Sequence, residues 1–164
     1  MRMRIAGWAL SLMLAVLIGA CAGQPKTPAV DTVATTAAID SLNKAFVAAV
    51  AARDTIAVVN FYASDAQVLP AGMSRVEGHE AIRAFWVGFL QTPGLDFNIT
   101  SSHPIISQAG DMVIDVGSYA MKATDAKGKP MEDVGKYVTV LKKVDGEWKI
   151  VVNTFNSDRS APGM

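Results

Sequence analysis

The chain contains a single cysteine, Cys21, among its 164 residues. A disulfide bond within the chain is therefore excluded, and its folded part must be stabilised by packing. There are only two histidines, His79 and His103, and neither belongs to a group with the spacing of metal ligands. A glycine-rich phosphate-binding loop is also missing. We therefore expect neither a metal nor a cofactor.

Positive charge is sparse and dispersed. Fifteen Lys and Arg residues balance fifteen Asp and Glu residues, and no segment gathers the cations as a phosphate-binding surface requires. Without Arg2 and Arg4 the balance becomes 13 basic against 15 acidic residues, a formal net charge of −2. These counts predict that nucleic acid is not a partner.

A hydrophobic run of fourteen residues stands near the N-terminus. Arg2 and Arg4 precede an apolar stretch over residues 5–18, which small residues and Cys21 follow. A basic start, a short apolar stretch and small residues at a cleavage site are the parts of a secretory signal. The run is shorter than the roughly 20 apolar residues of a spanning helix. An uncleaved anchor and a plain secreted protein are the alternatives.

The segment Leu17-Ile18-Gly19-Ala20-Cys21 resembles a bacterial lipobox. The resemblance implies a signal peptide over residues 1–20 and a mature protein that acyl chains on Cys21 attach to a membrane. Residues 21–30 contain two prolines and predict an extended tether. Because Ala22 is not aspartate, the resemblance implies the outer membrane, facing the periplasm, if the cell is Gram-negative. We therefore expect a lipid-anchored protein of the cell envelope.

Residues 31–158 have the length and periodicity of one domain, with a short tail over residues 159–164. No internal repeat is evident. Apolar residues at helical spacing predict a long helix over residues 31–52 and a third helix over 78–91. Between them, Asp54 is suited to cap a short helix that ends near Tyr62.

From Leu95 onward the hydrophobic period changes to two, which predicts strands. Asp145-Gly146 is a strong hairpin signal between the last two of them. Helices followed by an antiparallel meander indicate an α+β fold, with three N-terminal helices against a curved sheet. The expected strands are residues 66–69, 97–102, 112–123, 134–144 and 147–155.

Six segments of the domain carry a resemblance to a known family: residues 62–66 (YASDA), 78–86 (GHEAIRAFW), 116–119 (VGSY), 135–137 (GKY), 145–150 (DGEWKI) and 156–157 (NS). They resemble the SnoaL-like family, and most closely its branch known as domain of unknown function 4440, in the ketosteroid isomerase-like (nuclear transport factor 2-like, cystatin-like) superfamily. The resemblance implies a cone, in which a bent sheet surrounds the first helix and leaves a pocket at its open end. It also implies a homodimer formed through the sheet.

In ketosteroid isomerases a carboxylate base follows the second helix, on the first strand. The corresponding strand here, Gln67-Val68-Leu69-Pro70, has no carboxylate. Asp115 is the one acid within a strongly apolar strand, where alternation groups it with Val113 and Tyr119. If that face lines the pocket, Asp115 is a buried functional acid with a raised pKa. The alternative, which we expect because aspartates are seldom fully buried, is a surface carboxylate.

Tyr137 and Lys136 point to opposite faces of their strand, and we expect Tyr137 to enter the cavity. The alternative is a core tyrosine whose hydroxyl is satisfied nearby. Trp86 and Trp148 are expected chiefly as core residues. Asp115 and Tyr137 are thus the catalytic candidates, and the candidates for the pocket wall are Tyr62, Gln67, Trp86, Tyr119, Tyr137 and Asn153.

Two kinds of function remain open. Without a base at the expected position, we predict a pocket domain that binds a small apolar molecule or a protein partner without catalysis. The alternative is an isomerase or cyclase that acts on a small hydrophobic substrate through Asp115 or Tyr137. A third possibility is an assembly role, in which the sheet docks a second copy or another envelope protein.

Overall fold

The computed structural model describes residues 29–125 and 127–159. The predicted signal segment, Cys21, most of the tether and most of the tail lie outside the described residues. Among the helices that the structure describes, none is both long enough and apolar enough to cross a membrane.

Three helices form where the periodicity predicts them. The Asp31 carboxylate accepts a hydrogen bond from the Ala34 amide at the start of the first helix, and Asp54 accepts one from Ala57 at the start of the second, both at 2.9 Å. Aspartate at this position satisfies an amide that has no partner within the helix. The helices are α1 (Thr32–Ala51), α2 (Thr55–Asn60) and α3 (Gly78–Leu90).

Six strands form one sheet in the order β2-β1-β6-β5-β4-β3. The last four strands make the predicted antiparallel meander, whereas β1 joins the sheet parallel to β6. The short strand β2, which the sequence analysis did not predict, pairs with β1 just before α3. The strands are β1 (Tyr62–Pro70), β2 (Val76–Glu77), β3 (Asp96–Ile106), β4 (Met112–Thr124), β5 (Pro130–Val144) and β6 (Glu147–Ser157).

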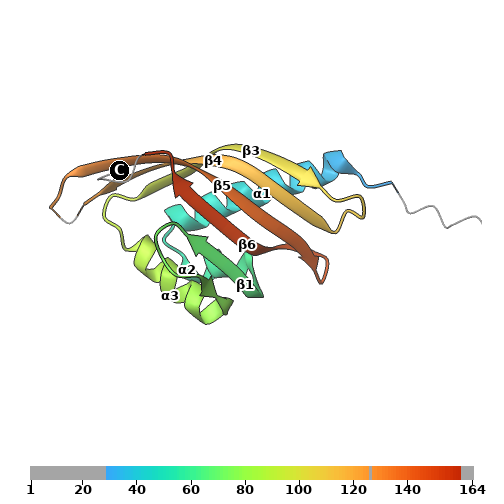
Figure 1. Ribbon diagram of the computed structural model, residues 1–164, viewed down its shortest axis with the longest axis horizontal. Helices are drawn as coiled ribbons and strands as arrows, with labels where there is room; N and C mark the ends of the chain where they lie inside the picture. Colours follow the sequence, from blue (N-terminus) through green and yellow to red (C-terminus); the bar gives the residue numbers. More distant parts are fainter. Residues whose placement is uncertain (1–28, 126, 160–164) are drawn as a thin grey trace, which may run out of the picture.

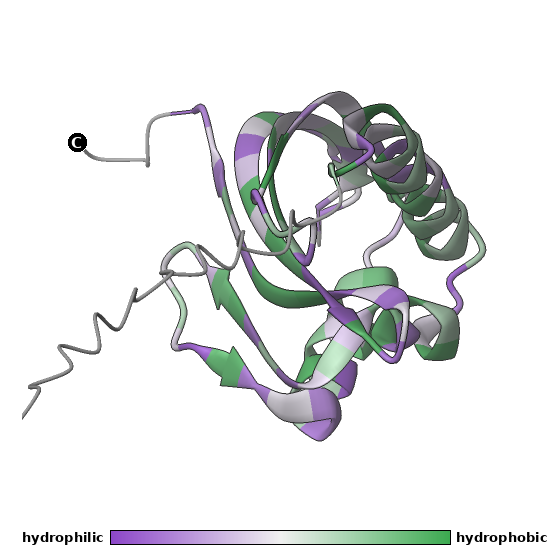
Figure 2. Cartoon of the chain, turned by 90° about the vertical axis from the view of Figure 1, so that its right-hand side faces the viewer, coloured by the Kyte–Doolittle hydropathy of each residue, from purple (hydrophilic) through white to green (hydrophobic). Residues whose placement is uncertain are grey.

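The three helices lie on one side of a curved sheet, as the sequence predicts (Figure 1). Seen from the side, the sheet bends around this helical layer and does not lie flat (Figure 2). The core forms where α1 and α3 meet the concave face of the sheet. It contains Ile39 and Val50 of α1, Ile82 of α3, and Val113 and Leu141 of the sheet, each at most 1% exposed.

Two β-bulges change which side chains face the helices. The pairing of β3 with β4 shifts between Ile99 and Ser101, and that of β6 with β5 shifts where Val140 gives way to Leu141. An extra residue in one strand reverses the alternation beyond it. Ile99 therefore faces the concave side before the first bulge, and Ser102, opposite Gly117, faces it afterwards.

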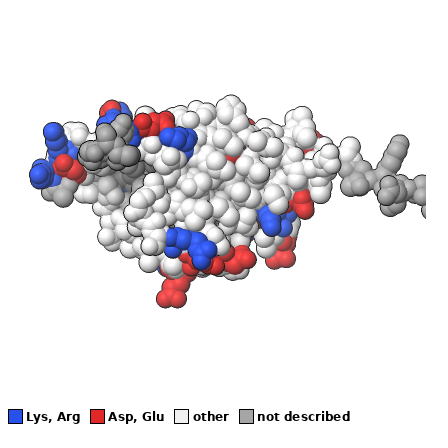
Figure 3. All heavy atoms as spheres, in the orientation of Figure 1, with Lys and Arg blue, Asp and Glu red and all other residues white. Residues whose placement is uncertain are grey.

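The turn at Asp145-Gly146 forms the predicted hairpin between β5 and β6. Both residues have positive φ, 52° and 86°, which is the conformation of a two-residue type I′ turn. Charged groups of both signs lie mainly around the ends and the lower edge of the face seen in Figure 3, and a broad uncharged area lies between them.

Candidate functional site

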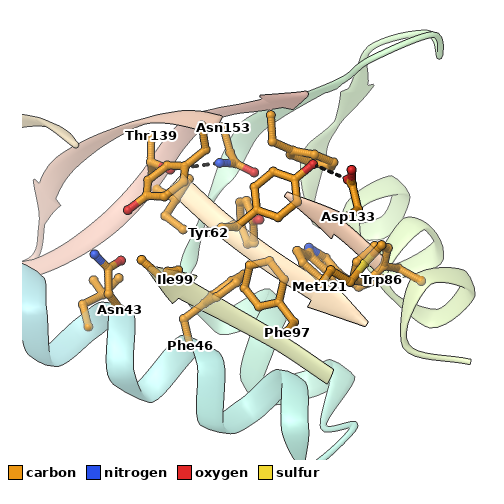
Figure 4. A pocket seen from close by; sticks show the side chains of 16 residues that line it. Asn43, Phe46, Tyr62, Trp86, Phe97, Ile99, Met121, Asp133, Thr139 and Asn153 are labelled. Carbon is orange, nitrogen blue, oxygen red and sulfur yellow. Dashed lines mark hydrogen bonds between the residues drawn. The ribbon is translucent and has the colours of Figure 1, made fainter. Parts of the chain in front are cut away.

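A cavity of about 170 Å³ lies between the concave face of the sheet, α1 and α3. Its wall is largely aromatic, with rings from both helices and from several strands (Figure 4). Phe46 of α1 contacts the rings of Trp86 and Phe97 edge-on, at centroid separations of 5.4 and 6.5 Å. Such edge-to-face contacts fix the ring positions and give the cavity a defined shape.

Most of the residues predicted for the pocket wall lie there. Tyr62, Trp86, Tyr119, Tyr137 and Asn153 all line the cavity. Trp86 is at the same time a core residue, only 4% exposed, and Trp148 packs at the edge of the core.

Gln67 is not among the residues that line the cavity, so the expectation for it is wrong. In the parallel pairing of β1 with β6, Val68 lies opposite Asn153, a cavity residue, while Gln67 lies opposite Val152. Neighbouring residues in a strand face opposite sides, so Gln67 faces away from the cavity. The Gln67–Pro70 segment therefore presents the fully buried Val68 to the interior.

Asp115 is 1% exposed, and the expectation of a surface carboxylate is wrong. Its Oδ1 accepts a hydrogen bond from Ser102 Oγ at 2.7 Å. Its Oδ2 accepts one from Asn43 Nδ2 and one from Tyr137 Oη, both at 2.9 Å. Three donors offset the cost of removing the carboxylate from water, which makes its burial tolerable. Asp115 does not itself line the cavity, although Asn43 and Tyr137 do.

Two of these donors, Asn43 and Ser102, are not among the residues predicted for the site. Asn43 follows Ile39 by four residues and precedes Phe46 by three, so it lies at the edge of the apolar stripe of α1. A polar residue in that position is a signal for a buried partner. Ser102 gives no such signal, because only the bulge in β3 turns it toward Asp115.

Tyr137 is held as a neutral hydrogen-bond donor. Burial raises the pKa of its phenol well above the usual range, and the adjacent Asp115 carboxylate raises it further. Its ring lies over Gly117, the residue opposite it on β4, where a Cβ atom would collide with the ring and with the Ser101 carbonyl. Glycine at position 117 is thus what allows the phenol to reach Asp115.

A second tyrosine–aspartate pair lies in the cavity wall, and its acid, Asp133, is not among the residues predicted for the site. Tyr119 Oη donates to Asp133 Oδ2 at 2.9 Å, and Ser157 Oγ donates to Asp133 Oδ1 at 2.6 Å. Burial raises the pKa of Tyr119, and the hydrogen bond and charge of Asp133 raise it further. The Tyr119 ring lies over Gly135, where a Cβ atom would collide with it.

The two pairs come from a repeated five-residue pattern, Asp-Val-Gly-x-Tyr, at residues 115–119 and 133–137. The statement that the chain has no internal repeat is therefore wrong at this scale. Each tyrosine reaches across to the other copy of the pattern, on the neighbouring strand. Its ring lies over the glycine of that copy, and its hydroxyl donates a hydrogen bond to the aspartate of that copy. The repeat could have been found in the sequence by comparing the two strands directly.

Two polar atoms in the cavity region have no hydrogen-bond partner among the described residues. They are Tyr62 Oη and Trp86 Nε1, both fully buried. An unpaired buried polar group costs about 1–3 kcal/mol. Burial also raises the pKa of the Tyr62 phenol far above its ordinary value, and the neighbouring Trp86 side chain lowers it in part, so the two groups are close without a well-formed hydrogen bond between them.

Within residues 29–125 and 127–159, no three His, Cys, Asp or Glu side chains are grouped so that they could hold a metal ion. The ring of His79 is within hydrogen-bond distance of the Tyr62 carbonyl oxygen, with Nε2 at 2.8 Å. His103 is exposed on β3.

A bent sheet that covers helices and leaves an interior pocket defines the nuclear transport factor 2-like class of folds. The sequence from residue 43 to 151 matches the SnoaL-like domain, and the chain belongs to that family. The finer assignment to domain of unknown function 4440 stays a prediction. None of the curated proteins matches the chain.

Solved structures agree with this class. A nuclear transport factor 2-like protein with a cystatin-like fold from Novosphingobium aromaticivorans is 12% identical, with a TM-score of 0.67 over 79% of this chain and 86% of the other. A ketosteroid isomerase-like protein from Erwinia carotovora is 16% identical, with a TM-score of 0.64 over 76% of this chain and 96% of the other. A hexachlorocyclohexane dehydrochlorinase from Novosphingobium barchaimii is 18% identical, with a TM-score of 0.69 over 80% of this chain and 93% of the other. At these identities the likeness establishes the fold alone.

Proposed function

We propose that this domain binds a small, mostly apolar molecule in its aromatic cavity and releases it unchanged. The observation that supports this most is the state of the Asp115 carboxylate. Three internal donors occupy it, and it does not itself line the cavity. A carboxylate in this state has a structural role and is not free to exchange a proton with a ligand in the cavity.

The size of the cavity limits the ligand. An engineered apolar cavity of about 150 Å³ in another protein binds benzene. The cavity here is similar, about 170 Å³, and its wall adds polar groups that can orient a ligand. A molecule with about one ring and a short substituent therefore fits it.

Filling the cavity tests the proposal. Ile99 lines it, whereas Ile105 on the same strand is 60% exposed and faces away from it. We expect 4-ethyltoluene to bind the unmodified domain in a calorimetric titration. Ile99→Phe should weaken that binding at least tenfold, and Ile105→Phe, the matched control, should leave the dissociation constant unchanged. Failure to bind, or equal affinity in both variants, would contradict the proposal.

A second candidate is an enzyme of isomerase or cyclase type, or another proton-transfer enzyme. It is favoured by Asp133, a carboxylate within the cavity wall that could receive a proton from a substrate. The same fold occurs in a hexachlorocyclohexane dehydrochlorinase, so the fold is compatible with catalysis. Turnover of an apolar substrate that Asp133→Asn abolishes without weakening binding would favour this candidate.

We also propose that Cys21 carries the lipid that anchors the domain in the cell envelope. The support is the lipobox-like segment that ends at this cysteine. The roughly ten residues between Cys21 and α1 span at most about 35 Å, which would keep the domain close to the membrane surface.

A homodimer through the convex face of the sheet is proposed as well. Three apolar residues on that face, Ile105, Val116 and Val134, are between 39% and 60% exposed. Val116→Arg should convert a dimer to a monomer in light scattering after gel filtration. A wild-type monomer at micromolar concentration would contradict this proposal.

A further inference from the structure

The two Asp-Val-Gly-x-Tyr segments are related by an approximate two-fold axis across the β4–β5 ladder. Ser118 lies opposite Lys136 at its centre, Gly117 opposite Tyr137 on one side, and Tyr119 opposite Gly135 on the other. Since Asp133 lies opposite Met121, the two aspartates are six positions apart along the ladder, roughly 20 Å at ~3.3 Å per residue. The structure thus contains two copies of one site, and they can be compared directly.

The two copies share two donors. In each, the aspartate accepts a hydrogen bond from the tyrosine of the other strand, at 2.9 Å in both cases. In each, a serine from a neighbouring strand donates to the second carboxylate oxygen: Ser102 of β3 to Asp115 at 2.7 Å, and Ser157 of β6 to Asp133 at 2.6 Å. The geometry of these four bonds is nearly the same.

The third donor distinguishes the copies. The Asn43 amide of α1 reaches Asp115 and gives it a third donor. No corresponding bond to Asp133 is present among the described residues, and no lysine or arginine there forms an ion pair with it. Asn43 and Asp133 lie on opposite sides of the cavity (Figure 4), so the side chain that supplies the third donor to Asp115 is remote from Asp133.

Asp133 has acceptor capacity to spare, and it faces the cavity. A carboxylate offers about four acceptor positions, of which the two bonds to Asp133 use two. The side chain is only partly exposed and lines a cavity with largely apolar walls. A carboxylate in such a place gains from any further N–H or O–H donor, because hydrogen bonds to charged groups are strong and a poorly solvated charge is costly.

We propose that an N–H or O–H group of the ligand donates to Asp133 in the place that the Asn43 amide takes at Asp115. The ligand class is a small, mostly apolar molecule that bears a hydroxyl, amide or amine group. The inference rests on the proposed binding function and specifies the group by which the ligand is oriented.

Three probes of nearly the same shape test it: 4-ethylphenol and 4-ethylaniline, which have a donor, and 4-ethyltoluene, which has a methyl group in its place. Calorimetric titration at neutral pH gives the ratio of the dissociation constant of 4-ethyltoluene to that of each donor probe. Asp133→Asn should lower both ratios about tenfold, which corresponds to roughly 1.4 kcal/mol. Asp158→Asn is the matched control, since that half-exposed carboxylate pairs with Lys136 outside the cavity, and its ratios should equal those of the unmodified domain.

The outcomes separate this inference from the function on which it rests. If 4-ethyltoluene binds but Asp133→Asn leaves the ratios unchanged, water and not the ligand supplies the third donor, and the inference is wrong while the binding function stands. If no probe binds the unmodified domain, both are wrong.

A measurement on the unmodified domain avoids any effect of substitution on folding. In carbon-detected NMR, 4-ethylphenol should shift the Asp133 carboxyl resonance, whereas 4-ethyltoluene should leave it close to its position without ligand. Equal shifts from both probes would contradict a direct hydrogen bond to Asp133.

Discussion

Removing one hydroxyl from each of two buried tyrosines should lower stability at one position and not at the other. Tyr62 Oη has no partner among the described residues, whereas Tyr137 Oη donates to the buried Asp115 carboxylate. The change Tyr→Phe removes the same atom at both positions and keeps the ring. The comparison therefore isolates the hydrogen bond.

The magnitudes follow from the state of each hydroxyl. A hydrogen bond to a charged group contributes about 1.5–3 kcal/mol, so Tyr137→Phe should lower the free energy of unfolding by that amount. An unpaired buried hydroxyl costs about 1–3 kcal/mol, so Tyr62→Phe should be neutral or stabilising. Unfolding by urea, followed by circular dichroism, measures both values.

A double-mutant cycle serves as the control. Asp115→Asn combined with Tyr137→Phe should give a coupling energy above about 1 kcal/mol, whereas Asp115→Asn combined with Tyr62→Phe should be additive within ~0.5 kcal/mol. Equal losses for Tyr62→Phe and Tyr137→Phe would refute the assignment of their hydrogen bonds.

Three further changes have definite expected results. All three tyrosines of the chain have a raised pKa in the folded protein, so folding favours their protonated form. Absorbance at 295 nm should therefore show no tyrosinate in the folded protein near pH 10. Above that pH the unfolded chain loses these protons first, so the free energy of unfolding should fall by about 1.4 kcal/mol per pH unit for each tyrosine. A tyrosinate signal from the folded protein at pH 10 would contradict this. Gly117→Ala should cost at least about 1–3 kcal/mol of unfolding free energy because the methyl group meets the Tyr137 ring and the Ser101 carbonyl; Gly88→Ala in α3, with nothing within 4 Å, should be neutral or stabilising. Cys21→Ala should abolish incorporation of labelled palmitate in a bacterial host, and undiminished labelling would show that this cysteine is not the anchor.

The class of fold could be predicted because local signals and hydrophobic period agree along the chain. Asp54 caps its helix, the stripe of α3 is buried, and Asp145-Gly146 forms the hairpin. The parallel pairing of β1 with β6 could not be predicted in the same way, since no local turn connects these two strands.

The site was less predictable, for two physical reasons. Bulges reverse the alternation of side chains along β3 and β6. Regular alternation along the sequence therefore does not predict that Ser102 and Asn153 face the interior. The burial of Asp115 depends on donors that are 13, 22 and 72 residues away in the sequence. The average preference of aspartate for the surface holds only where such donors are missing.

The most direct test of the central claim, a hollow domain that takes a ligand with its donor at Asp133, is a crystal structure of the protein soaked in 4-iodophenol. Anomalous scattering locates the iodine without reference to any starting coordinates. We predict iodine inside the aromatic cavity and the phenol oxygen within hydrogen-bond distance of Asp133. A cavity filled by its own side chains, or iodine bound only at the surface, would contradict the account.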